Sequence, residues 1–280
     1  IPDGQKKIDE FGNKAYKLSL AKKWQFPVPD TVYLSGELVK EIYEKKKVPA
    51  EILLHFKNKL LAIRPSPVVG QFSKSEPFLH VGLEDQSYDI LERRLGFKKA
   101  SAIYLSFLRM FAVTVYNLDL ENCGELRTLL DNLKSEELAP GESSLNKISR
   151  IKQLITLETG AIFPKTISEQ LIEIINSIYR AWISPTQKIL RDVSGRESGE
   201  LIPIILQEMH SGSIDQPVGY FKVKNFDDKT GRSSCQCFKL GNSDEKSFYN
   251  PVNEEEFNKL LKINSLDNLI RNLTKQIKSP

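Results

Sequence analysis

Two cationic residues, Lys14 and Arg64, are of types that can bind an anion. Lys14 follows Gly12 at the start of a segment with apolar residues at helical spacing, and Arg64 ends a short apolar run before Pro65. Glycine lets the backbone approach a ligand closely, and the N–H groups at the start of a helix attract anions. Lysine adds a compact positive charge, whereas the planar guanidinium of arginine can hold two phosphate oxygens at once. These residue types are compatible with phosphate binding, and each residue taken alone also fits an ordinary solvated side chain.

The cysteines indicate a reducing cellular compartment rather than a disulfide framework or a metal site. Cys123, Cys235 and Cys237 form an odd and sparse set, which does not suit a disulfide framework and predicts a reducing cytoplasm. A zinc site would need a second cysteine pair beside Cys235 and Cys237, and the histidines are scattered along the chain. We therefore interpret these two cysteines as neighbours on one strand.

Composition excludes several classes of partner. The 280 residues predict one or two compact bodies with sizeable cores. Forty Lys and Arg residues against 36 Asp and Glu leave a formal net charge of +4, too small and too evenly spread to predict a nucleic-acid partner. No apolar run approaches the roughly 20 residues of a membrane-spanning helix, so we expect no membrane association. The first residue is Ile1, as expected for an excised or processed piece.

Helices and strands alternate around the two cations. Apolar spacing predicts a helix over Gly12–Trp24, a strand over Thr31–Leu34, helices over 36–46 and 49–60, and a strand over Leu60–Ile63. Residues 65–80 combine Pro, Ser, Gly and Lys without periodicity, which is typical of a surface loop. Lys14 is thus expected near the start of a helix, and Arg64 where a buried strand meets a loop.

The rest of the chain is predicted to be helical first and then richer in strands. Residues 85–157 have a helical pattern with a polar break at 135–144. Thr166 and Glu169 form a capping box for a helix whose apolar stripe is Leu171, Ile174, Ile175, Ile178 and Trp182, with Pro185 just past its end. Strands are expected over 201–206, 218–223 and 234–240, and a helical tail over 254–275.

Seven segments in order resemble the N-terminal ATP-binding part of pyruvate phosphate dikinases and phosphoenolpyruvate synthases. They are Phe11–Leu18 with Phe26–Pro29 and Val32–Ser35, Leu61–Arg64, Phe78–Asp85, Tyr104–Val115, Glu158–Gly160 with Phe163 and Pro164, Ala181–Trp182 with Ser184 and Pro185, and Ile204–Met209. Seven matches in the family's order are more specific than any one of them. The Glu-Thr-Gly segment followed by Phe-Pro favours the dikinase branch over the synthases.

The resemblance implies an α+β, ATP-grasp-like nucleotide-binding domain with a helical insertion and an incomplete C-terminal lobe. Residues 1–84 and 158–210 would form the first lobe, 85–157 the helical insertion, and 211–280 a partial second lobe with a helical tail. ATP phosphates would meet Lys14, the catalytic Arg64 would clamp the transferring phosphoryl group, and Gln207, Glu208 and Met209 would meet the nucleotide base. ATP and Mg²⁺ are the implied cofactors. Downstream phosphohistidine and pyruvate-binding domains are the implied partners.

The sequence departs from the family where the chemistry is most demanding. Pro65, Ser66 and Pro67 replace small residues and a glycine-rich phosphate loop, and proline supplies no N–H donor. Lys224 stands where the family has an arginine, and the later acidic segment that binds Mg²⁺ has no counterpart before Pro280. The histidines His55, His80 and His210 match no phosphohistidine motif. The alternative is a catalytically inactive dikinase-like protein used for nucleotide sensing or protein binding, and an unrelated α+β interaction module stays open as a third.

Overall fold

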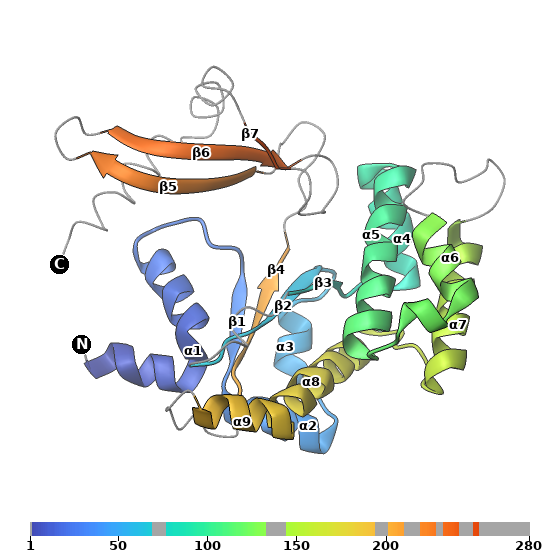
Figure 1. The fold of residues 1–280 in the computed structure, drawn as a ribbon, viewed down its shortest axis with the longest axis horizontal. Coiled ribbons are helices and arrows are strands. Elements are labelled where there is room, and N and C mark those ends of the chain that lie inside the picture. Colours follow the sequence, from blue (N-terminus) through green and yellow to red (C-terminus); the bar gives the residue numbers. More distant parts are fainter. Residues whose placement is uncertain are drawn as a thin grey trace. The chain divides into compact units, whose positions relative to one another are not determined.

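The computed structural model describes residues 2–68, 77–132, 144–193, 201–209, 219–227, 232–240 and 249–251. Contacts divide the chain into two units, the first made of residues 1–22 and 27–210 and the second of residues 23–26 and 211–280. The described part is mixed α and β, mostly helical, and its first unit contains a small four-stranded antiparallel sheet (Figure 1).

The sheet of the first unit joins strands that lie far apart in the sequence. Its order is β1 (Thr31–Leu34), β4 (Ile204–Glu208), β2 (Leu61–Pro65) and β3 (Phe78–Val81). The central strand β4 pairs with both β1 and β2, and Gln207 lies opposite both Thr31 and Ala62. The first strand agrees with the sequence prediction. The strand β4 begins later than the predicted 201–206 because Pro203 cannot donate to a ladder, and it continues to Glu208.

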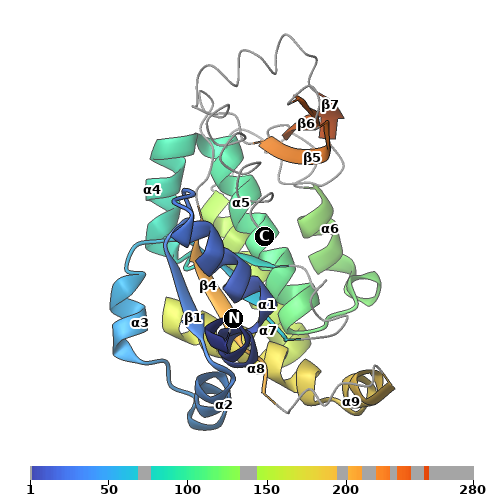
Figure 2. The same cartoon turned by 90° about the vertical axis from the view of Figure 1, so that its left-hand side faces the viewer.

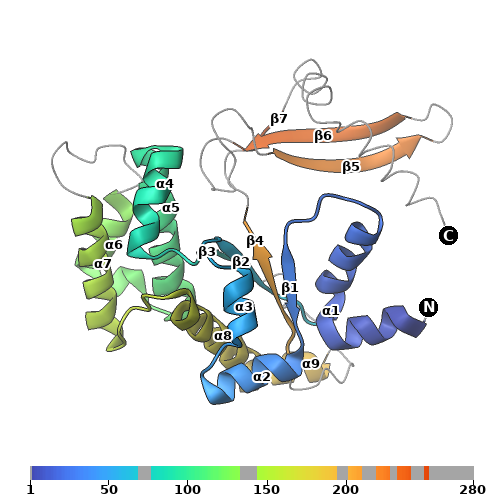
Figure 3. The ribbon, with the colours of Figure 1, turned by 180° about the vertical axis from the view of Figure 1, so that it is seen from behind.

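One face of this sheet belongs to the main hydrophobic core. Alternation along the strands places Leu34, Leu61, Ile63, Ile204 and Leu206 on that face, and each is at most 1% exposed. Residues of α2 (Gly36–Lys45), α3 (Ala50–His55) and α8 (Ile167–Ile183) belong to the same core cluster (Figure 3). The helix α1 (Pro2–Lys23) lies on the other side of β1 from α3, as Figure 2 shows.

Two of the local predictions around the sheet need correction. The predicted loop over 65–80 is wrong at both ends, because Pro65 is the last residue of β2 and Phe78–Val81 forms β3. The predicted helix over 49–60 stops at His55, and Asn58 takes a positive φ of 61° that a helix cannot continue. Residues 69–76 of the predicted loop lie outside the described residues.

The predicted helical stretch packs beside β3 (Figure 1). It contains α4 (Asp85–Leu95), α5 (Phe97–Met110), a π-helical turn (Phe111–Val115), a short 3₁₀ turn (Leu120–Asn122), α6 (Gly124–Asn132) and α7 (Ser144–Thr159). Tyr104, Phe107, Phe111 and Phe163 form a chain of ring contacts, with centroids 5.0–6.1 Å apart. These rings join the same hydrophobic cluster as the sheet, so the helices share one core with it.

The helix α8 is the element that the sequence predicts best. Its capping box is present: the Thr166 hydroxyl accepts the Glu169 N–H at 3.3 Å, and the Glu169 carboxylate accepts the Thr166 N–H at 3.0 Å. The backbone N–H groups of Thr166 and Lys165, which both donate to the Glu169 carboxylate, hold the pKa of Glu169 below its usual value. All five residues of the predicted apolar stripe are buried. Pro185 does more than follow this helix, because it begins α9 (Pro185–Val193) after the capping residue Ser184.

Replacing Thr166 with alanine removes the hydroxyl that caps α8. We expect the free energy of unfolding to fall by about 1 kcal/mol, the usual value of such a cap. Urea denaturation followed by circular dichroism measures the change. Thr128, which is exposed on α6 and donates to the Gly124 carbonyl within its own helix, provides the matched control, and Thr128→Ala should change stability by less than about 0.5 kcal/mol. Equal losses for both variants would contradict the capping role.

The second unit contributes a three-stranded antiparallel sheet with the order β5 (Gly219–Asp227), β6 (Arg232–Leu240) and β7 (Tyr249–Pro251). Cys235 and Cys237 both belong to β6, which confirms their interpretation as two residues of one strand. The predicted strand over 218–223 continues to Asp227. The predicted helical tail over 254–275 lies outside the described residues.

Candidate functional site

The backbone around Gly12 docks onto the residue that follows β2. Gly12 interrupts the helical geometry of α1 with φ 78° and ψ 169°, and a Cβ added there would lie 1.4 Å from the carbonyl oxygen of Ser66. The Ser66 hydroxyl accepts the Ala15 N–H at 3.2 Å, and the Asn13 amide donates to the Val68 carbonyl. The close approach that Gly12 permits is therefore to Ser66 of the protein itself.

This contact brings Lys14 next to the end of β2, beside Arg64. The Lys14 ammonium donates to the Pro65 carbonyl oxygen at 3.0 Å. Burial, and then the positive charge of Arg64, lower the pKa of Lys14 below its usual value. Among the described residues, no carboxylate forms an ion pair with Lys14 or Arg64. Two like charges thus lie close together without a described counter-ion, which costs free energy that a bound anion would offset.

Gln207 lies on the same face of the sheet as Arg64. Ala62 stands opposite Gln207 and Arg64 stands opposite Ile205, so the alternation of both strands directs the four side chains to one face. Thr31 and Tyr33 of β1 continue this face, and the Gln207 amide donates to the Thr31 hydroxyl at 3.2 Å. Ile205 is buried, whereas Thr31, Tyr33, Ala62, Arg64 and Gln207 keep part of their surface exposed. We call these five residues the open face.

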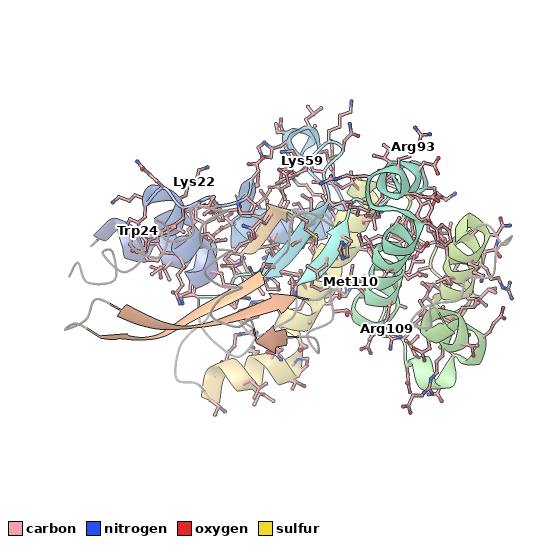
Figure 4. The ribbon with its side chains drawn as sticks, turned by 90° about the horizontal axis from the view of Figure 1, so that it is seen from above. Lys22, Trp24, Lys59, Arg93, Arg109 and Met110 are labelled. Carbon is pink, nitrogen blue, oxygen red and sulfur yellow. The ribbon has the colours of Figure 1, made fainter. Side chains whose placement is uncertain are left out.

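Glu208 is turned away from this open face. Its carboxylate pairs with Lys59 at 3.1 Å, and Lys59, labelled in Figure 4, also pairs with Asp30 at 2.9 Å. His55 lies 2.8 Å from the same Asp30 carboxylate. The Glu208 N–H donates to the Asp30 carbonyl at 2.8 Å, so both the side chain and the N–H of Glu208 are engaged within the protein. The sequence resemblance groups Glu208 with Gln207, but strand alternation separates their side chains.

Met209 follows β4 directly and is tied to both neighbouring segments. Its N–H donates to the Leu60 carbonyl at 2.8 Å. Its sulfur accepts the N–H of His80 at 3.1 Å, where β3 departs from regular pairing and His80 takes a positive φ of 61°. Non-glycine residues with positive φ are uncommon and often occur beside functional sites. The backbone N–H groups of Glu208 and Met209 are both used inside the protein.

Sequence reasoning missed two residues that shape this site. Ser66 is fully buried and links three segments, because its N–H also donates to the Pro203 carbonyl at 2.8 Å. A small polar residue between two prolines was the available signal. Tyr33 lies 6.3 Å from Phe11 between ring centroids, and burial raises the pKa of its phenol. Neither role is visible without the contact between α1 and the sheet.

Chemically, the open face and Lys14 can bind an anion, but a divalent cation has no evident ligands there. Within residues 2–68, 77–132 and the other described ranges, no group of three or more His, Cys, Asp or Glu side chains could hold a metal ion. The helices searched in that part of the chain include none that is both long and apolar enough to span a lipid bilayer.

No protein-family model matches the chain, and no curated protein matches it.

Proposed function

We propose that the chain is an ATP-binding domain of a pyruvate phosphate dikinase-like protein, with an ATP-grasp-like architecture and a cytoplasmic location. The observation that carries the proposal is the juxtaposition of Lys14 and Arg64 without a described counter-ion. A buried or half-buried cation normally has an anionic partner, because desolvation without one is unfavourable. A polyphosphate would supply that partner. Cys123, a buried free thiol, supports a reducing compartment.

Each residue of the site has a role that its position allows. The fork of Arg64 would hold two oxygens of one phosphate, and Lys14 would add a point charge to a neighbouring one. The open face beyond Arg64 offers the Gln207 amide and the Tyr33 ring to the rest of the nucleotide. Since the N–H groups of Glu208 and Met209 and the Glu208 carboxylate are engaged within the protein, these two residues would meet the base through backbone carbonyl oxygens or the Met209 side chain.

A second candidate is nucleotide binding without phosphoryl transfer, and the arrangement of the described acidic residues favours it. The described chain offers no cluster of acids for Mg²⁺, and the Glu208 carboxylate is occupied by Lys59 on the opposite face. The described residues therefore do not fit the metal that the dikinase resemblance implies, and we derive no transfer step through it. This candidate shares the Lys14–Arg64 anion site and differs only in what happens to the bound nucleotide.

Calorimetric titration with ATP tests the proposal, with the native chain compared with Lys14→Ala and Arg64→Ala. We expect each substitution to weaken ATP binding by about 10- to 100-fold, the usual effect of losing one hydrogen bond to a charged group. The controls are Lys45→Ala, whose lysine pairs with Glu41 on the surface of α2, and Arg93→Ala on the exposed side of α4, and both should leave affinity unchanged.

Two outcomes decide between the candidates. No heat from the native chain with ATP would refute the nucleotide site altogether. Titration with ATP in the presence and absence of Mg²⁺ addresses the metal: equal affinities favour binding without transfer, whereas tighter binding with Mg²⁺ favours a phosphotransferase whose acidic ligands lie outside the described residues.

A further inference from the structure

The amine of Lys14 differs in its surroundings from other lysines of the first unit. Lys59 pairs with Asp30 and Glu208, Lys152 pairs with Asp85, and Lys45 pairs with Glu41. Each of those carboxylates stabilises the charged ammonium form. The Lys14 amine instead has a neutral acceptor, the Pro65 carbonyl, and a cationic neighbour, Arg64. Its surroundings thus favour the neutral amine more than those of the paired lysines do.

This difference has a chemical consequence, because only a neutral amine is a nucleophile. Burial and the charge of Arg64 lower the pKa of Lys14, whereas hydrogen bonds to carboxylates raise the pKa of Lys45 and Lys59. Near neutral pH the fraction of unprotonated amine is therefore greater at Lys14 than at those two lysines. Half-burial leaves part of the Lys14 side chain open to a small reagent.

We propose that Lys14 is a modification site for small acyl phosphates, in which Arg64 binds the phosphate group and the Lys14 amine attacks the adjacent acyl carbon. The nitrogen lone pair forms the new C–N bond, and the bond from the acyl carbon to the bridging oxygen breaks. The electron pair of that bond leaves with inorganic phosphate, and the nitrogen gives one proton to solvent. The products are an amide at Lys14 and free phosphate, with no oxidant or reductant required.

The amide would change the anion site, because it removes one of the two positive charges. The proposal rests on the Lys14–Arg64 anion site proposed above and adds a control on it. An acylated Lys14 leaves Arg64 as the remaining cation of the pair, so the affinity for a polyphosphate should fall as it does in Lys14→Ala. Acylation and nucleotide binding would then oppose each other.

Peptide mapping by mass spectrometry after incubation with acetyl phosphate near neutral pH tests the proposal on the whole chain. We expect acetylation of Lys14 at least about tenfold faster than that of Lys45, the internal control. Inorganic phosphate should slow the reaction of Lys14 with acetyl phosphate more than its reaction with the N-hydroxysuccinimide ester of acetic acid, because that ester carries no phosphate and does not compete for Arg64. Equal rates at Lys14 and Lys45, or no competition by phosphate, would overturn the proposal.

The variant Arg64→Gln separates phosphate binding from the electrostatic effect of the arginine. If Arg64 holds the reagent, the variant loses much more reactivity toward acetyl phosphate than toward the phosphate-free ester, and an equal loss toward both would overturn the assignment. Calorimetry with ATP keeps the two proposals apart. A native chain that binds ATP but shows no preferential acetylation of Lys14 refutes only the modification site, whereas preferential acetylation without ATP binding refutes only the nucleotide assignment.

Discussion

Replacing Gly12 with alanine is expected to lower the free energy of unfolding of the first unit by about 3 kcal/mol or more. Two effects add. The backbone at Gly12, with φ 78° and ψ 169°, lies in a region that residues with a Cβ occupy only at a cost of about 1–3 kcal/mol. The new Cβ would also lie 1.4 Å from the Ser66 carbonyl oxygen and 2.7 Å from its hydroxyl oxygen, so the two segments must separate.

Gly96 offers a matched control for this substitution. Its backbone has nearly the same conformation, with φ 81° and ψ 156°, but a Cβ added there meets no atom within 4 Å. Gly96→Ala should therefore show the backbone cost alone, about 1–3 kcal/mol. Urea denaturation of both variants, followed by circular dichroism, isolates the contact with Ser66 as the difference. Equal losses of stability would mean that glycine is needed at position 12 only for its backbone conformation, and that Ser66 can move away from an added Cβ at no cost.

The same substitution should affect the anion site. Lys14 reaches the Pro65 carbonyl because Gly12 allows the close approach to Ser66. In Gly12→Ala the segment carrying Lys14 moves away from Arg64, and ATP affinity should fall by about tenfold or more, as expected when a charged contact is misplaced. Gly96→Ala should retain the native affinity. If the Gly12→Ala protein binds ATP with native affinity, ATP binding does not depend on the contact of α1 with Ser66.

Replacing Gln170 with methionine is expected to be the other large loss, about 3 kcal/mol. The fully buried side chain of Gln170 in α8 accepts the Gly82 N–H at 2.8 Å and donates to the Leu83 carbonyl at 2.8 Å. Methionine preserves the length and the helix propensity but satisfies neither backbone group. Each buried group left without a partner costs about 1–3 kcal/mol.

Gln153 on α7 is exposed and serves as the control, because Gln153→Met should change stability by less than about 0.5 kcal/mol. Thermal unfolding and urea denaturation would measure both variants. A loss below about 1 kcal/mol in Gln170→Met would mean that water or a backbone shift satisfies Gly82 and Leu83. Through these two hydrogen bonds, Gln170 connects the turn after β3 to α8, the helix that covers the sheet.

Local signals account for the elements that the sequence predicts well. The residues of the capping box at Thr166 and of the apolar stripe of α8 lie within a few turns of one helix, so the sequence pattern alone identifies them. The strand Thr31–Leu34 is similarly bounded by Pro29 and Ser35. The strand Phe78–Val81 escaped prediction because it follows a stretch of Pro, Ser, Gly and Lys without periodicity, and its irregular pairing with β2 is a tertiary contact.

The residues of the candidate site also differ in how far the sequence alone could predict them. Lys14 and Arg64 are predicted from the resemblance to the dikinases, and the assignment of ATP to them stays a prediction. Glu208 could be separated from Gln207 only once β4 was known to run from Ile204 to Glu208 with its partners in register. The predicted range 201–206 ended before both residues, so their alternation could not be applied.

By itself, then, the sequence determined where most helices and strands form, because hydrophobic spacing, caps and prolines act within a few residues of each other. Only the tertiary structure decided that Gly12 docks on Ser66, that Lys14 lies beside Arg64, and that Gln170 bridges Gly82 and Leu83. Those contacts join residues 50 or more positions apart. Their partners are selected by the packing of the whole unit, which no local pattern specifies.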